Sequence, residues 1–256
     1  MKRLTLACSI LAASVVGAAA ADLPPRVYTK APPKIAQQTF GWTGWYVGAQ
    51  LGGTSGEANH SIVLDGLGFL NAPFGPTKID GFNYGGIIGY DRQMSPTWVL
   101  GVNAEFNGGK IKGLFDNGPP QGLGPGGDDI YKSKVRWFGS VRGKIGWVVP
   151  GAPWLMVYAT NGVAFAEIWG ANGDGLDGTS ALDVRQGSGS TTKVGYTVGG
   201  GVSWMIPGTR WVLTGEGAYY DFGRARIDTV TNDGTPHIFK IDTQFAVGRA
   251  VFSYKF

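Results

Sequence analysis

Two histidines, His60 and His237, are the side chains best suited to catalysis in this chain of 256 residues. Each falls in a long predicted loop, and the two loops adjoin if the last predicted strand pairs with the first. Ser61, next to His60, is the immediate candidate for a nucleophile, but the sequence contains no G-x-S-x-G motif. We therefore expect no catalytic residue and no enzyme. Lipid-directed activity that disappears when both histidines are replaced would revive a catalytic role.

Two further patterns resemble binding motifs. Gly122–Gly127 has the form G-x-G-x-x-G, but Pro125 removes an amide donor and no strand–helix unit surrounds the segment. The acidic segments 128–129 and 172–177 lack the spacing and the terminal glutamate of a calcium loop. Both patterns are predicted to be solvated loops, with no cofactor and no metal site.

A third set consists of charged residues on the polar face of the predicted strands. Burying such charges is costly unless each meets a partner of opposite sign. The set is therefore predicted to form a polar network inside the fold, and a narrow, charge-lined path for solutes is the alternative. Its members are Glu105, Arg136, Arg142, Lys144, Glu216 and Arg249.

Composition indicates which elements position these residues. The 44 glycines have no three-residue period, which excludes collagen, and 12% aromatic residues are too many for a disordered chain. Interior glycines disfavour helices by roughly 1 kcal/mol each. An all-β protein with many turns remains, with one domain of the barrel or sandwich type.

The N-terminal region is predicted to be processed and extended. Residues 1–21 have the basic start, apolar stretch and alanine-rich end of a Sec-type signal peptide, which would also remove Cys8. Residues 22–39 contain four prolines and are predicted to form a periplasmic arm. From Phe40 onward, 17 basic residues balance 17 acidic ones, so the overall charge of +4 gives no support to nucleic-acid binding.

Residues 40–256 contain eight runs in which residues alternate between two faces, as strands require. On residues 98–107, an apolar face from Trp98 to Phe106 alternates with a face that includes Asn103 and Glu105. The eight predicted strands are Trp42–Gly53, Ile79–Gln93, Trp98–Lys112, Ser133–Val149, Trp154–Trp169, Thr192–Met205, Arg210–Gly223 and Ile241–Phe256.

The loops between these strands alternate in length. Connections of 25, 19, 22 and 17 residues alternate with connections of 4, 4 and 3 residues. An antiparallel up-and-down sheet places the long connections at one end and the short ones at the other. Long external loops, short periplasmic turns and an even number of strands are typical of outer-membrane barrels.

Tryptophans gather near the predicted short turns. Such a ring is typical of a membrane–water interface, where the amphipathic indole lies between lipid and water. Trp42 lies near the same end. The predicted periplasmic girdle comprises Trp45, Trp98, Trp147, Trp154, Trp204 and Trp211.

Three segments carry a family resemblance: Ala21–Pro24, Trp42–Gly48 and Tyr254–Phe256. Together they resemble the small outer-membrane β-barrel family of alphaproteobacteria, a porin-like surface-antigen group, over essentially the whole mature chain. The resemblance implies insertion by the barrel-assembly machinery, with the last strand as its signal. Phe252, Tyr254 and Phe256 share one face of that strand and are the expected assembly signal.

The sequence thus predicts a monomeric, eight-stranded, antiparallel up-and-down transmembrane β-barrel in the outer membrane of a Gram-negative cell. Its expected role is structural, supporting the envelope and contacting lipid, lipopolysaccharide or other partners at the surface. A small-solute porin and loop-mediated binding of a haem-type ligand are the alternatives. A secreted soluble barrel would instead bury its apolar faces and stay in solution without detergent.

Deleting Phe256 is expected to lower the amount of protein assembled in the outer membrane, because the change removes the last aromatic residue of the expected signal. The assembled fraction can be measured from the heat-modifiable band on a gel. An unchanged band would contradict the assignment.

Overall fold

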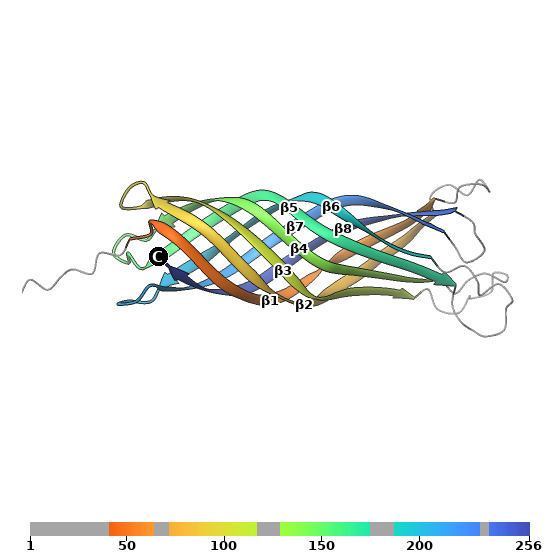
Figure 1. Ribbon diagram of the computed structural model, residues 1–256, viewed down its shortest axis with the longest axis horizontal. Helices are drawn as coiled ribbons and strands as arrows, with labels where there is room; N and C mark the ends of the chain where they lie inside the picture. Colours follow the sequence, from red (N-terminus) through yellow and green to blue (C-terminus); the bar gives the residue numbers. More distant parts are fainter. Residues whose placement is uncertain (1–40, 64–71, 117–128, 175–186, 231–235) are drawn as a thin grey trace, which may run out of the picture. The chain divides into compact units, whose positions relative to one another are not determined.

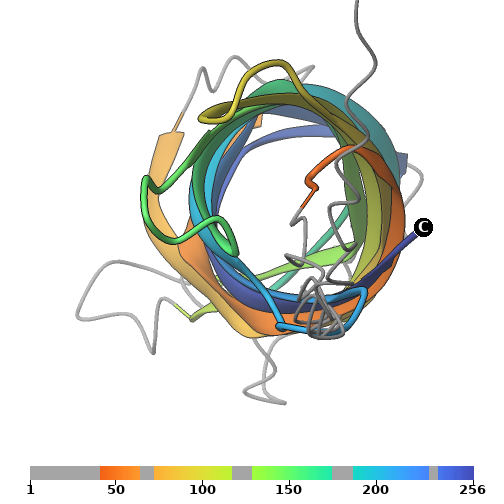
Figure 2. The same ribbon diagram turned by 90° about the vertical axis from the view of Figure 1, so that its left-hand side faces the viewer.

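The computed structural model describes residues 41–63, 72–116, 129–174, 187–230 and 236–256, which form one closed β-barrel (Figures 1 and 2). The predicted signal peptide and proline-rich arm lie outside the described residues. Each strand pairs with its sequence neighbours in antiparallel fashion, and β1 pairs with β8 to close the barrel. The strands are β1 (Gly44–Val63), β2 (Ala72–Gln93), β3 (Trp98–Asp116), β4 (Asp129–Val148), β5 (Leu155–Asp174), β6 (Gly187–Met205), β7 (Trp211–Val230) and β8 (Pro236–Lys255).

The predicted fold class, an eight-stranded antiparallel up-and-down barrel, is confirmed. Residues 94–97, 149–154 and 206–210 connect strands at one end, which we call the turn end, and the C-terminus lies there too (Figure 1). We call the opposite end the loop end. Within the described residues, no helix is long and apolar enough to cross a bilayer.

The apolar face of each strand lies on the outside of the barrel. On β3, Trp98, Leu100, Val102 and Phe106 are about half exposed, whereas Val99, Asn103, Glu105 and Asn107 are buried. A soluble protein would bury the first set and expose the second. The reversed arrangement fits lipid as the surrounding solvent, as the alternation along residues 98–107 predicted.

The strands continue beyond the bounds that the sequence predicted. β1 ends at Val63 instead of Gly53, and β4 begins at Asp129 instead of Ser133. The predicted boundaries followed the apolar face, which stops at the edge of the membrane. Backbone pairing has no reason to stop there, so each strand has 19 to 22 residues, about twice the 9–11 that cross the bilayer.

β-Bulges change which residues face inward. On β4, Arg136 is an extra residue between the pairs Val135–Ile168 and Trp137–Glu167. Phe138, Ser140 and Arg142 face inward on the turn side of the bulge, whereas Val135 faces inward on the loop side. One unbroken alternation along the β4 sequence would place Val135 on the apolar outer face with Trp137 and Val141, and the bulge turns it inward instead.

The two larger of three apolar clusters inside the barrel lie on either side of its middle, and the third comprises Tyr46, Ile87 and Val251. The loop-side cluster packs rings edge to face, with Phe138 5.2 Å from Tyr220 and 5.3 Å from Phe245 between ring centroids. The turn-side cluster comprises Trp42, Val99, Val148, Met156, Tyr158, Met205 and Val212. The charged residues lie between these two clusters.

A bulge on β7 depends on Gly223, whose φ of 55° lies in the left-handed region. The Gly223 amide also donates a 2.8 Å hydrogen bond to Asp221 Oδ1.

Gly223→Val is expected to lower the free energy of unfolding by about 1–2 kcal/mol, because a β-branched residue is strained there. Gly217→Val is the matched control on the same strand, since no atom lies within 4 Å of a Cβ at that position. Equal stability of the two variants in denaturant unfolding would contradict this account.

Candidate functional site

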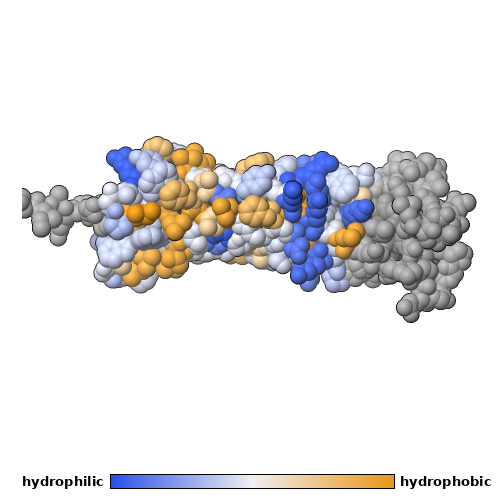
Figure 3. Space-filling view, turned by 90° about the horizontal axis from the view of Figure 1, so that it is seen from below, coloured by the Kyte–Doolittle hydropathy of each residue, from blue (hydrophilic) through white to orange (hydrophobic). Residues whose placement is uncertain are grey.

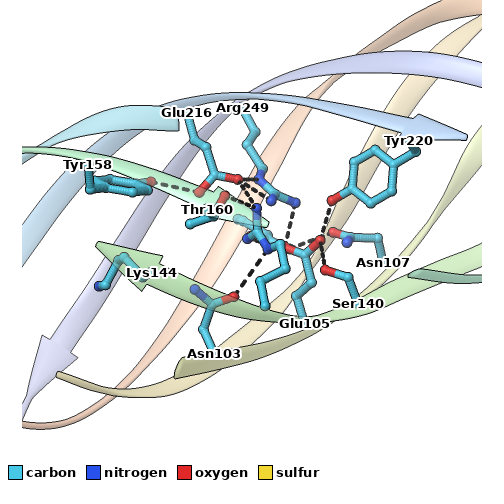
Figure 4. Close-up of polar contacts among 12 residues, drawn as sticks. Asn103, Glu105, Asn107, Ser140, Lys144, Tyr158, Thr160, Glu216, Tyr220 and Arg249 are labelled. Atoms are coloured by element: carbon cyan, nitrogen blue, oxygen red, sulfur yellow. Dashed lines mark hydrogen bonds and ion pairs between the residues drawn. The ribbon is translucent and has the colours of Figure 1, made fainter. Parts of the chain in front are cut away.

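The centre of the barrel holds four charged side chains from four strands, which we call the ionic cluster. Arg142 comes from β4, and three labelled residues complete the set, with Glu105 from β3, Glu216 from β7 and Arg249 from β8 (Figure 4). All four side chains are buried. Each of the four residues faces inward on its strand at the same height along the barrel axis. Two carboxylates therefore meet two guanidinium groups.

Each arginine of the ionic cluster contacts both glutamates. Arg142 lies 3.1 Å from Glu105 and 2.7 Å from Glu216, measured from guanidinium nitrogen to carboxylate oxygen. Arg249 lies 2.6 Å from Glu105 and also pairs with Glu216. The four charges sum to zero, so the ring stabilises groups that would be costly to bury alone.

Neutral side chains add hydrogen bonds to the cluster. Ser140 donates to Glu105 at 2.9 Å, and Tyr220 also donates to Glu105. Tyr158 donates to Glu216 at 2.6 Å, while Arg142 donates to Asn103 at 3.2 Å. These contacts fix the rotamers of the charged groups, so the cluster forms a cross-brace between opposite walls of the barrel (Figure 4).

Two glycines, Gly52 and Gly101, leave space for charged side chains inside the barrel. Gly52 lies opposite Arg249 in the β1–β8 pair, and a Cβ there would lie 2.7 Å from the Arg249 Cβ. A Cβ on Gly101 would lie 2.3 Å from Asp91 Oδ1. Glycine thus admits large charged groups into a lumen that is narrow in an eight-stranded barrel.

A second charged group lies nearer the turn end. Asp91 contacts Lys144 at 2.6 Å and Lys255 at 3.4 Å. Lys144 also lies over the Tyr46 ring, 4.8 Å from its centroid. The internal space beside these residues is about 30 Å³, which is room for one or two water molecules. Lys144, predicted to belong to the polar network, is inside the barrel but pairs in this separate group.

Trp42 closes the turn end from within. Its indole N–H donates to the Pro153 carbonyl at 3.0 Å, and its backbone N–H donates to Gln93 Oε1 at 3.1 Å. The side chain is almost fully buried. The sequence placed Trp42 near the interfacial ring, whereas the six residues predicted for the girdle, Trp45, Trp98, Trp147, Trp154, Trp204 and Trp211, are exposed on the outside.

One prediction about the polar network was wrong. Arg136 faces outward, because the β4 bulge reverses the alternation at that residue, and it forms a 2.9 Å ion pair with Glu167. Trp137 Nε1 donates to the same carboxylate at 2.9 Å. The structure brings Glu105, Arg142, Glu216 and Arg249 together and leaves Arg136 on the outer wall.

The residues of the expected assembly signal lie at the turn end of β8. Phe252 and Phe256 are exposed on the outer face, and Phe252 stacks on Trp211 with a centroid distance of 4.6 Å. Tyr254 packs edge to face against Trp211 at 5.0 Å. The backbones of His60 and His237 lie on the paired strands β1 and β8, and the side chains of both are outside the described residues.

Sequence reasoning missed several polar partners inside the barrel. Asp91 and Lys255 continue the inward alternation of their strands, and Lys255 is six residues from Arg249. Tyr158 and Tyr220 follow the same rule, and Tyr220 is four residues from Glu216. Counting by two from Arg249 and Glu216 would have identified Lys255 and Tyr220, whereas Asp91 and Tyr158 lie on β2 and β5, for which no interior charge was predicted.

The chain was compared with protein-family profiles, with known sequences and with solved structures. The profile of the "Outer membrane protein beta-barrel domain" family matches residues 6–256. The 31 kDa outer-membrane immunogenic proteins of Brucella melitensis biotype 1 and Brucella suis biovar 1 are each 31% identical over 261 residues, which cover 100% of both chains. A superposition on the crystal structure of OprG from Pseudomonas aeruginosa covers 84% of this chain and 96% of that one, with 14% identity and a TM-score of 0.49.

Glu105→Gln is expected to lower the free energy of unfolding by about 3–5 kcal/mol, because two buried arginines then share one carboxylate. Combining it with Arg142→Met restores charge balance, so the double variant should be more stable than the sum of the single changes predicts. Denaturant unfolding followed by tryptophan fluorescence measures both quantities.

Glu167→Gln is the matched control for Glu105→Gln, because it makes the same chemical change at a partly exposed pair on the outer wall. A loss of at most about 1 kcal/mol is expected there. Additive effects of Glu105→Gln and Arg142→Met would show that the ionic cluster is not energetically coupled.

Proposed function

The chain belongs to the outer membrane protein beta-barrel domain family, and from this premise we propose that it is a non-conducting structural component of the outer membrane. It supports the envelope and presents its loop end at the cell surface. The protein works without catalysis, as a monomer, and its partners are membrane lipid, lipopolysaccharide and, during insertion, the barrel-assembly machinery.

The filled lumen is the observation that carries this proposal. A solute that enters from the loop end meets the loop-side apolar cluster, then the ionic cluster, then the turn-side cluster with Trp42. The internal space of about 30 Å³ lies on the turn side of the ionic cluster and is too small for any nutrient. A barrel built in this way braces its walls against each other and leaves no path for bulk water.

The outer wall supports a role within the membrane. Apolar residues alternate outward along the membrane-crossing part of each strand, and exposed tryptophans gather at the turn end. Short turns face the periplasm in barrels of this kind, which places the loop end outside the cell. The two Brucella relatives are described as immunogenic outer-membrane proteins, which is in keeping with a surface-exposed loop end.

Planar bilayers that contain the purified barrel are expected to show no reproducible stepwise conductance, because three layers of side chains block the lumen. A porin of known conductance, reconstituted under the same conditions, controls for insertion. Reproducible steps, or uptake of small sugars by liposomes, would favour the small-solute porin over a filled scaffold.

Deleting the gene tests the envelope role directly. Cells without the protein are expected to become more sensitive to detergents and to large apolar antibiotics, and the unmodified chain should restore resistance. A deletion strain with an unchanged barrier would contradict the structural role, whatever the conductance result.

A further inference from the structure

Five lysines project from the outer wall just beyond the apolar surface, on the side toward the loop end. They are Lys78 on β2, Lys110 and Lys112 on β3, and Lys132 and Lys134 on β4, and we call them the lysine patch. Lys134 is half-buried and the others are exposed. Figure 3, which shows one face of the molecule, has a band of strongly hydrophilic side chains in this region, next to the loop end.

The strand register places like charges against each other within the patch. Lys112 lies directly opposite Lys134 in the β3–β4 pair, and Lys132 lies opposite Leu114 one step further toward the loop end. Like charges in directly opposed positions destabilise a sheet. A counter-charge from the protein would relieve this repulsion.

Among the described residues that line the patch, the one carboxylate is that of Asp80 on β2, which lies directly opposite Lys112 in the β2–β3 pair. Within the described chain, Lys112, Lys132 and Lys134 form no ion pair with a carboxylate. Asp80 lies 3.9 Å from Lys78 at the β2 edge of the patch, and both side chains are mostly exposed. Five lysines thus share one exposed carboxylate among the described residues, and the patch keeps a net positive charge.

Arg136, the next outward-facing cation toward the membrane, forms an ion pair with a carboxylate of the protein. Arg136 is paired with Glu167 at 2.9 Å, and that carboxylate also accepts from the Trp137 indole. Phe106 stacks on Trp137 with a centroid distance of 5.6 Å and is the last large outward apolar side chain on β3 before Lys110. The protein thus neutralises Arg136 at the edge of the hydrocarbon layer, whereas the lysine patch further toward the loop end keeps a net positive charge.

The lysine of the patch nearest the membrane lies close to the headgroup layer, and Lys112 lies two residues, or about 7 Å of strand, further out. Lys110 follows Phe106 by four residues, or about 13 Å along the strand and about 10 Å along the membrane normal at the usual tilt. Headgroup layers add roughly 5–8 Å to each side of the hydrocarbon core. A lysine side chain can bend back over that difference to reach the headgroups.

The lysines also line a groove in the outer wall. Its lining includes four lysines, one carboxylate and one indole, from Lys78, Asp80, Lys112, Lys132, Lys134 and Trp169. Trp169 lies opposite Lys134 in the β4–β5 pair, so an aromatic side chain borders the cationic row. A groove of this kind can hold an anionic group beside the amphipathic indole.

We propose that the lysine patch binds phosphate groups on the headgroup of a phosphorylated glycolipid in the outer leaflet. The ammonium groups act as point charges toward phosphate, a role that lysine fills well. The patch faces sideways from the wall close to headgroup height, which favours membrane lipid over a soluble anion. This inference rests on the proposed orientation, with the loop end outside the cell.

The test compares the unmodified barrel in nanodiscs with the double variant Lys112→Gln/Lys134→Gln. Binding of phosphorylated lipid A and of chemically dephosphorylated lipid A is measured for both proteins. The double variant is expected to bind the phosphorylated lipid roughly 25-fold more weakly, or about five-fold per lysine near an anionic surface. The two proteins should bind the dephosphorylated lipid equally.

Arg92→Gln/Arg210→Gln is the matched control, because it removes two exposed positive charges at the turn end. It should leave binding of the phosphorylated lipid unchanged. An equal loss in both double variants would show a nonspecific charge effect and overturn the site. Inorganic phosphate that stabilises the barrel as much as phosphorylated lipid does would overturn the assignment to lipid.

A stability measurement separates ligand binding from a structural role of the lysines. In dephosphorylated lipid, Lys112→Gln/Lys134→Gln should be at least as stable as the unmodified barrel, because the change removes a repulsion. Phosphorylated lipid should raise the unfolding midpoint of the unmodified barrel only. A variant that is less stable in both lipids would overturn the proposal, while an unchanged barrier in gene-deleted cells would contradict only the envelope role.

Discussion

Closure of the sheet is the constraint on which the rest of this structure depends. Hydrocarbon offers no hydrogen-bond partners, so every backbone N–H and C=O at membrane depth must pair within the protein. The β1–β8 pair meets that requirement by removing both sheet edges. With eight strands, closure also fixes a lumen just wide enough for side chains. The inner surface must then be filled by residues that pack and pair with each other.

The ionic cluster is one solution to that filling problem. Glu105 and Glu216 reach the centre from β3 and β7, and each meets both Arg142 and Arg249. Because the four charges balance, the cluster needs no counter-ion. The apolar clusters on either side keep water away, and exclusion of water strengthens the ion pairs within. Bracing of the walls and blockage of the lumen therefore arise from the same contacts.

The fold and most of the charged residues inside the barrel could be predicted from the sequence, because two regular patterns determine them. Alternation of faces gave strands, and alternation of loop lengths gave an up-and-down barrel. The errors have local causes. Arg136 was assigned to the interior because a one-residue bulge leaves no mark in the hydrophobic pattern, and Trp42 was grouped with the interfacial tryptophans because inward folding before β1 depends on tertiary contacts. The strand ends were set too early because lipid determines where the apolar face stops, whereas backbone pairing determines where the strand stops.

Arginines inside the barrel and at the hydrocarbon edge are paired with glutamates, whereas the lysines of the patch outnumber their carboxylates. This contrast identifies the patch as the place where a ligand would supply negative charge. Inside, Arg142 and Arg249 have no source of negative charge except the protein, and two glutamates provide it. At the hydrocarbon edge, Arg136 likewise has Glu167. Above that edge, Lys112 and Lys134 oppose each other, and the nearby carboxylate of Asp80 forms its ion pair with Lys78. A protein that neutralises its cations wherever lipid or a dry lumen surrounds them can leave them charged where the surroundings carry phosphate. The arrangement of the lysines is thus a property of the barrel and its membrane together.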